Sequence, residues 1–211
     1  MREYIDERAA VADYMRRLYE RGLTTCLAGN ISLRIGDIVL ITPAKVDKGR
    51  INPKQVGIMT MEGEKLTPVV ELSIETEMHL SVLQNRADIS AVIHAHPTIA
   101  TFFSATDVDI NTTLTAEAYA ALGVPLKVPY VLMGTKQLAS SVSQAAMKSN
   151  VVIMENHGIL TVGENLLEAF NRVEILESVA KMNWIMKSGS YSIKTMAPQA
   201  LEEIVKKVGK I

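Results

Sequence analysis

Two short apolar runs with two residues between them constrain the fold of this chain more than any other feature. Ile31–Ile35 and Ile38–Thr42 are rich in β-branched residues, and Gly36-Asp37 separates them. A Gly-Asp pair in this position is typical of a β-hairpin, so the two runs are predicted to form antiparallel strands. A sheet that contains both strands is therefore mixed or antiparallel.

Helical and extended segments alternate along the rest of the chain. Gly22, Asn150 and Gly189 are suited to end helices, and Asn165 is suited to begin one. No Gly-x-Gly-x-x-Gly or P-loop motif follows a strand, which removes the dinucleotide-binding and P-loop folds. Helices are predicted over residues 6–21, 74–83, 98–104, 116–122, 137–148 and 165–188, and extended segments over residues 57–61, 92–97, 126–132, 151–154 and 159–162.

The order of these elements and the composition predict one domain of the α/β class. With 48% hydrophobic residues and no repeat, the 211 residues are enough to bury one core. We expect a three-layer α/β/α arrangement in which helices cover a central, mostly antiparallel mixed sheet. This domain is expected to span residues 1–211, with about 20 residues at its end as a C-terminal tail or helix.

Charge and cysteine usage limit the partners and the compartment. The 22 basic and 23 acidic residues give a net charge of -1, and the basic residues are scattered, so we expect no nucleic-acid partner. The charged N-terminus does not resemble a signal peptide and no apolar run is long enough to span a bilayer, so we expect a cytoplasmic protein without a membrane partner. The single cysteine, Cys26, cannot form an internal disulfide and is predicted to be a small buried side chain.

Two histidines in the extended segment 92–97 are the start of a candidate metal site. His94 and His96 are two residues apart, so their side chains leave the same face of a strand. Neutral imidazole nitrogen suits zinc and other transition metals. A His-x-His pair also occurs among ordinary surface histidines, so the pair alone favours neither interpretation.

A third histidine strengthens the metal interpretation. His157 lies between two apolar runs, at a bend predicted by Asn156 and Gly158, where a side chain can point into a cleft. The fourth histidine, His79, lies one helical turn after Glu75. A glutamate and a histidine on one helical face would also suit a metal, so this pair is a second candidate.

Five short motifs in one order give the chain a family resemblance. They are Ala28-Gly29-Asn30-Ile31-Ser32, Leu40-Ile41-Thr42-Pro43, Ser73-Ile74-Glu75, His94-Ala95-His96 and Asn156-His157-Gly158. Over roughly residues 10 to 190 the chain resembles the class II aldolase/epimerase family of fuculose-1-phosphate aldolase and ribulose-5-phosphate 4-epimerase. The resemblance implies one zinc ion per chain, or another divalent metal in its place. The implied ligands are Glu75, His94, His96 and His157, with Glu75 also as the catalytic acid/base.

The implied ligand set suits chemistry beside a carbonyl. Three neutral imidazoles leave zinc dipositive, and departure of the Glu75 carboxylate opens a position for substrate. Cleavage of a neighbouring C–C bond builds negative charge on oxygen as an enediolate, which a Lewis acid stabilises. Glu75 then moves the proton, and we expect burial beside Leu72 and Ile74 to raise its pKa. The resemblance leaves His79 outside the ligands, as a packing histidine or an outer hydrogen-bond partner.

The family's phosphate site is only partly present. Its positions are here Gly29, Asn30, Ala44, Lys45, Ser73 and Ile74. Relatives have Ser/Thr-Gly at 44–45 and a second serine at 74, so two hydroxyl donors are lost. Lys45 is expected to attract the anion as a point charge, with Lys48 and Arg50 close in sequence. The alternatives are a solvated Lys45 and a site for a carboxylate or another group.

This chain also lacks the proton donor of the aldolases it resembles, which is a tyrosine between the His-x-His strand and the next strand. Leu114 or Thr115 stands nearest to that position. Tyr119 and Glu117 are candidates to replace it, although a core or subunit contact is the simpler role for Tyr119. Glu155 and Glu117 are expected to be solvated or structural carboxylates.

The resemblance implies a zinc-dependent class II aldolase that cleaves a small keto-sugar phosphate to a three-carbon ketone phosphate and an aldehyde. Glutamate rather than aspartate at position 75 favours the aldolases over the epimerase. The alternatives are a metal-dependent decarboxylase or phosphate-free aldolase on the same fold, and a catalytically inactive metal-binding interaction domain. The family also implies a homotetramer with active sites at subunit interfaces.

Overall fold

A computed structural model describes residues 3–68, 70–189 and 191–208 and contains one seven-stranded sheet. The strand order is β3-β2-β1-β4-β7-β6-β5. Neighbouring strands are antiparallel except for β5 and β6, which are parallel, so the predicted mostly antiparallel mixed sheet is confirmed. The strands are β1 (Asn30–Ile35), β2 (Ile38–Ile41), β3 (Gly57–Thr60), β4 (Ala91–Ala95), β5 (Leu126–Val128), β6 (Val151–Met154) and β7 (Gly158–Gly163).

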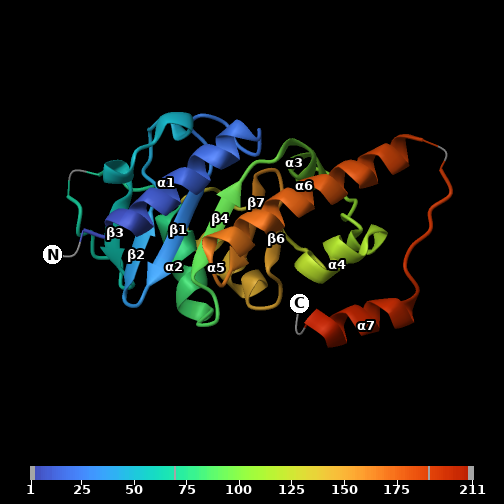
Figure 1. Ribbon diagram of the computed structural model, residues 1–211. Coiled ribbons are helices and arrows are strands. Elements are labelled where there is room, and N and C mark those ends of the chain that lie inside the picture. The colour runs from blue at the N-terminus through green and yellow to red at the C-terminus, as the bar shows by residue number, and fades with distance from the viewer. Residues whose placement is uncertain (1–2, 69, 190, 209–211) are drawn as a thin grey trace.

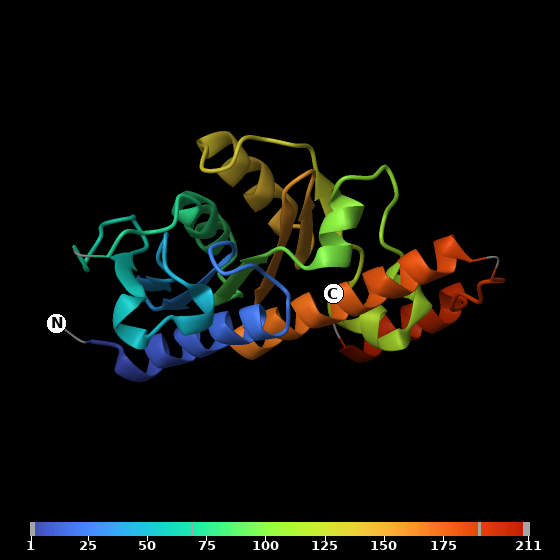
Figure 2. The ribbon, with the colours of Figure 1, turned by 90° about the horizontal axis from the view of Figure 1, so that it is seen from above.

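Helices cover both faces of this sheet, which confirms the three layers. α2 and α5 pack on one face, and α1 and α6 run along the other with α3 and α4 beside α6 (Figures 1 and 2). The α-helices are α1 (Ile5–Glu20), α2 (Thr76–Asn85), α3 (Thr98–Ser104), α4 (Ala116–Leu122), α5 (Lys136–Ala146), α6 (Leu166–Ser188) and α7 (Pro198–Val208), and short 3-10 turns are η1 (Lys48–Arg50), η2 (Pro53–Gln55) and η3 (Thr112–Leu114).

The core consists of two apolar layers, one on each side of the sheet. Successive side chains of a strand point to opposite faces. Ile93 accordingly packs with the layer under α1 and α6, whereas Val92 packs with the layer under α2 and α5. Since both faces are covered, the central strands are apolar on both sides, and a polar residue on them is exceptional.

Several local predictions are confirmed. Ile35 pairs with Ile38 across the hairpin turn. The Asn165 side chain accepts a hydrogen bond from the backbone N–H of Glu168 and so caps α6, and Gly189 follows its last residue. The tail carries α7, which packs beside α4 (Figure 1). In the described part of the chain, no helix is long and apolar enough to cross a membrane.

Three local predictions were wrong. The extended segment from residue 126 ends at Val128, because Pro129 has no N–H to continue a strand ladder. The helix predicted to reach residue 148 ends at Ala146, followed by a tight turn in which Lys148 N–H bonds to the Ala145 carbonyl. Cys26 is exposed rather than buried, because it lies in the loop before β1 and not on an element that faces the core.

Candidate metal and active site

The candidate site lies where β1 and β4 meet at one end of the sheet. In the register of these strands Asn30 is opposite His94, and on the other side of β4 His94 is opposite Leu160 of β7. Cross-strand neighbours project from the same face. His94 and Asn30 are therefore both held on the face that α2 covers.

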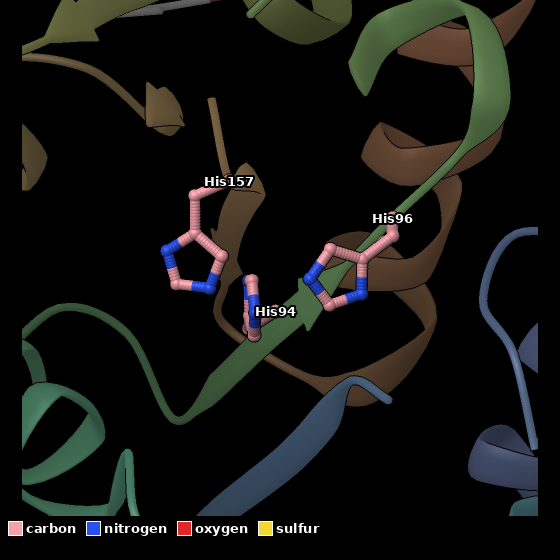
Figure 3. A group of neighbouring side chains, drawn as sticks. All are labelled: His94, His96 and His157. Atoms are coloured by element: carbon pink, nitrogen blue, oxygen red, sulfur yellow. The ribbon is translucent and has the colours of Figure 1, made fainter. Parts of the chain in front are cut away.

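The three predicted histidines lie together. His96 follows β4 directly, and His157 lies in the turn between β6 and β7, where Asn156 has a positive φ of 52°. Ligand atoms of His94, His96 and His157 lie within 4.8 Å of one another. Figure 3 shows the three imidazole rings turned toward one another, two of them from the end of β4 and one from the turn. The predicted bend at Asn156 and Gly158 thus does aim His157 at the other two.

Hydrogen bonding orients the central ring. His94 Nδ1 lies 2.9 Å from the Ile159 carbonyl, which can only accept, so Nδ1 carries the proton and the lone pair of Nε2 faces the site. Burial lowers the pKa of His94, and burial lowers the pKa of His96 to about 3. Neutral imidazoles with inward lone pairs are the form that binds a metal.

Glu75 completes this group, from a position that differs from the prediction. It is the residue before α2 rather than part of the helix. Its carboxylate is 3.3 Å from His94 Nε2 and 3.2 Å from His157 Nε2. Burial raises the pKa of Glu75, but His94, His157 and a hydrogen bond from Asn30 outweigh burial and hold the pKa below its usual range. The expected raised pKa is therefore wrong. Ile74 is 64% exposed and contributes little to burial of the carboxylate.

The donor atoms fit a divalent transition metal. Buried atoms without a hydrogen-bond partner are rare in proteins. Here two such atoms, Glu75 Oε1 and His94 Nε2, belong to side chains that meet in this group. Three imidazoles and one carboxylate are also a ligand set that suits zinc.

The remaining histidine is not part of this group. His79 is fully buried and contacts Asn30 Oδ1 through Nε2, while its Nδ1 lies 2.7 Å from Ser32 Oγ. His79 therefore lies outside the group of three histidines and is hydrogen-bonded within the core. Sequence reasoning gave no role to Ser32, although its position two residues after Asn30 on one strand places both on the same face.

The predicted phosphate positions also lie together. Asn30 Nδ2 donates to Ser73 Oγ at 3.0 Å, which joins the start of β1 to the segment before α2. The Ala44 N–H donates to the Glu71 carbonyl at 2.9 Å, so the loop after β2 runs beside the same segment. Gly29 has a φ of 73°, and a Cβ there would lie 2.7 Å from Thr24 Oγ1, which accounts for glycine at this position.

The basic residues of the loop after β2 take three different positions. Lys45 has a φ of 53°, in the left-handed region, and its exposed Nζ lies 2.8 Å from Glu71 Oε1. Lys48 is only 2% exposed, and its Nζ donates to the Pro43 carbonyl. Arg50 is exposed and lies 3.9 Å from Asp47. Among these residues Lys45 alone combines an exposed charge with a position next to the Ala44–Glu71 contact.

The other candidate acids lie apart from the histidines or have structural contacts. Glu117 is exposed on α4, where it lines a surface groove with Glu174 of α6. Glu155 Oε2 accepts a hydrogen bond from the Tyr130 N–H at 3.3 Å. Tyr119 is half-buried on α4. Thr115 caps α4 through a hydrogen bond from the Ala118 N–H.

Comparison with known proteins agrees with this geometry. Residues 9–184 match the model of the class II aldolase and adducin N-terminal domain family. The chain belongs to this family. As a class II aldolase family member it is a metal-dependent lyase, and the three gathered histidines are its possible metal site.

Several individual relatives of this class II aldolase family chain are named as enzymes of sugar phosphates or related phosphates. It is 35% identical to the L-fuculose phosphate aldolase of Methanococcus maripaludis over 82% of this chain and 93% of the relative. It is 32% identical to the 3-oxo-tetronate 4-phosphate decarboxylase of Haemophilus influenzae over 79% of this chain and 81% of the relative. A solved L-fuculose 1-phosphate aldolase superimposes with a TM-score of 0.88 at 30% identity, covering 96% of this chain and 95% of the other.

Proposed function

We propose that this chain is a zinc-dependent aldolase that cleaves a small keto-sugar phosphate of the fuculose-1-phosphate kind to a three-carbon ketone phosphate and an aldehyde. The observation that carries the proposal is the position of Glu75. Its carboxylate lies within 3.3 Å of His94 and His157, and Asn30 donates both to it, at 2.8 Å, and to Ser73. A group that can move a proton is thus next to two of the gathered histidines and to the proposed anion site.

The proposed ligands of one zinc ion are Glu75, His94, His96 and His157. The metal, when bound, supplies a Lewis acid that stabilises the negative charge developing on substrate oxygen as the C–C bond breaks. His94 keeps its lone pair in the site because the Ile159 carbonyl holds the Nδ1 proton. Glu75, which is 6% exposed, takes and returns the proton through a carboxylate oxygen.

The proposed anion site consists of Gly29, Asn30 and Ser73, with Lys45 as its cation. The Lys45 ammonium is exposed, and exposed ion pairs contribute little stability. Lys45 can therefore exchange Glu71 for a substrate phosphate at small cost. The φ of Lys45 lies in the left-handed region that favours glycine, so glycine at position 45 should remove strain.

A decarboxylase is the second candidate, favoured by the similarity to the Haemophilus influenzae enzyme. Loss of carbon dioxide beside a carbonyl builds the same kind of charge on oxygen as aldol cleavage, so the same side chains suit both reactions. The product separates them. An aldolase releases an aldehyde and a ketone phosphate, whereas a decarboxylase releases carbon dioxide from a 3-oxo acid.

We also propose a homotetramer with active sites at subunit interfaces. Large apolar side chains of α6 and α3 are exposed, including Trp184 (45%), Ile185 (47%) and Phe102 (51%). Neighbouring exposed apolar side chains are a mark of protein–protein contact. Light scattering should give four chains per particle, and an active monomer would contradict the proposal.

The test of the aldolase proposal has a metal part and a substrate part. Elemental analysis of the purified protein should give about one zinc per chain, and His94→Ala/His96→Ala should bind none. A panel of keto-sugar 1-phosphates should yield dihydroxyacetone phosphate in a coupled reductase assay. If carbon dioxide is released from 3-oxo acid phosphates instead, the decarboxylase replaces the aldolase.

Substitutions of Lys45 and of its partner Glu71 test whether Lys45 binds a substrate phosphate. Lys45→Ala should raise KM roughly ten- to a hundredfold, because it removes the charge-assisted contact to the phosphate. Glu71→Gln removes the competing carboxylate and should not raise KM. Ala44→Ser/Lys45→Gly/Ile74→Ser should recover much of the loss. If dihydroxyacetone phosphate neither binds nor inhibits the wild-type protein, the sugar-phosphate assignment fails.

A further inference from the structure

A chain of buried polar side chains runs from the core to Glu75. Ser32 and His79 are 0% exposed and Asn30 is 4% exposed. They lie on the sheet face that α2 covers, among apolar side chains such as Val82 and Val92. A buried polar group is costly unless it is hydrogen-bonded. These three side chains bond to one another, so each has a partner within the apolar layer.

The ionised carboxylate of Glu75 determines the direction of every hydrogen bond among these side chains. An ionised carboxylate only accepts, so the Asn30 atom 2.8 Å from Glu75 Oε2 is the amide nitrogen. Asn30 Oδ1 therefore faces His79 Nε2, which must carry the ring proton. His79 Nδ1 is then an acceptor, and the Ser32 hydroxyl donates to it at 2.7 Å. Burial lowers the pKa of His79 to about 3, which keeps the ring in this neutral form.

The Asn30 amide also determines which way the Ser73 hydroxyl points. Ser73 Oγ accepts from Asn30 Nδ2 at 3.0 Å and from the Glu75 N–H at 3.2 Å. With two donors directed at the oxygen, the hydroxyl hydrogen points elsewhere and is available to an acceptor such as an anion. A flipped Asn30 would place its oxygen against the Glu75 carboxylate and remove the donor to Ser73.

We propose that His79, oriented by Ser32, is a positioning residue that holds the Asn30 amide with its NH2 group toward both Glu75 and Ser73. In this role the His79 side chain acts on Glu75 and Ser73 through Asn30 rather than by direct contact. The Asn30 amide has nearly the same shape when its oxygen and nitrogen are exchanged, and His79 selects one of these two orientations. The consequence for turnover rests on the proposed function, whereas the orientation itself does not.

Nitrogen NMR of the metal-free, uniformly 15N-labelled protein tests the orientation without any substrate. The chain has four histidines, and loss of one signal set in His79→Gln identifies His79. His79 should be the Nε2–H tautomer, and the Asn30 side-chain NH2, identified with Asn30→Ser, should exchange slowly with solvent. In His79→Met, which has no donor at this place, that exchange should become at least tenfold faster. An Nδ1–H tautomer, or unchanged exchange, overturns the proposal whether or not a substrate is known.

Kinetics then separate positioning from packing. His79→Met should lower kcat/KM roughly ten- to a hundredfold, the effect of losing a hydrogen bond that holds charged and polar groups. His79→Gln restores a donor near the Nε2 position and should recover most of this loss. Met78→Leu changes a buried apolar side chain of the same helix and should have little effect. Equal losses in all three variants would mean that α2 packing alone matters, and would overturn the proposal.

Discussion

Lys48 is a charged side chain inside the core, and its replacement gives a quantitative test of the packing under the loop after β2. The side chain is 2% exposed, and Nζ donates to the Pro43 carbonyl. Burial lowers the pKa of Lys48 from 10.5 to about 8, because the ammonium loses water that stabilises its charge. The unfolded chain therefore binds this proton more tightly than the folded protein does.

The size and sign of the effect follow from that difference in pKa. The difference of about 2.5 (10.5 minus 8) lowers the free energy of unfolding by about 3 kcal/mol below pH 8, where both states are protonated. This loss shrinks as the pH rises from about 8 toward 10.5, because folded Lys48 becomes neutral first. Lys48→Met should therefore stabilise the protein most at pH 7, and its advantage should fall by roughly 2 kcal/mol by pH 10.

The pH dependence is the decisive quantity, because methionine also leaves the Pro43 carbonyl without a donor. That loss costs about 1–3 kcal/mol and acts equally at every pH. Urea unfolding of both proteins from pH 7 to pH 10, at one protein concentration and with metal chelated, measures the difference. Lys54→Met, at an exposed lysine nearby, is the control and should show no such trend. A difference that stays constant or grows toward pH 10 would refute the reasoning.

Two further predictions concern the candidate metal and active site. Gly158→Ala places a Cβ 2.6 Å from His96 Cδ2 and 2.8 Å from the Ala95 carbonyl, so it should displace the His96 ring. Zinc binding, measured by competition with a chelator, should weaken at least tenfold. The control is Gly163→Ala at the other end of β7, whose Cβ would lie 2.6 Å from the Ala169 N–H and which should destabilise the fold without this loss of zinc affinity. Equal zinc affinity in the two variants would contradict the geometry. Glu75→Gln should keep the circular dichroism spectrum and most of the zinc but lose turnover, since an amide cannot accept the proton; near-wild-type kcat would mean that another residue is the base.

Several turns, helix ends and site histidines of this protein could be predicted from its sequence, because each depends on residues that are close together along the chain. The Gly36-Asp37 turn between two β-branched runs determines an antiparallel hairpin through backbone geometry alone. Asn165 begins α6, because its side chain accepts a hydrogen bond from the backbone N–H of Glu168, three positions away. The His94 and His96 pair, and the bend at His157, were likewise visible as short patterns that place side chains relative to their own strand or turn.

The tertiary structure alone decided how distant segments meet. Glu75 precedes α2, and it reaches His94 and His157 because the register of β1, β4 and β7 brings those strand ends together. The burial of Lys48 and the pairing of Lys45 with Glu71 depend on how the loop after β2 folds back, which no local pattern encodes. The pKa of Glu75 followed from neighbours that are distant in sequence rather than from the apolar residues beside it. Local sequence therefore determined which chemical groups are present, and the packing of strands and helices determined which of them act on one another.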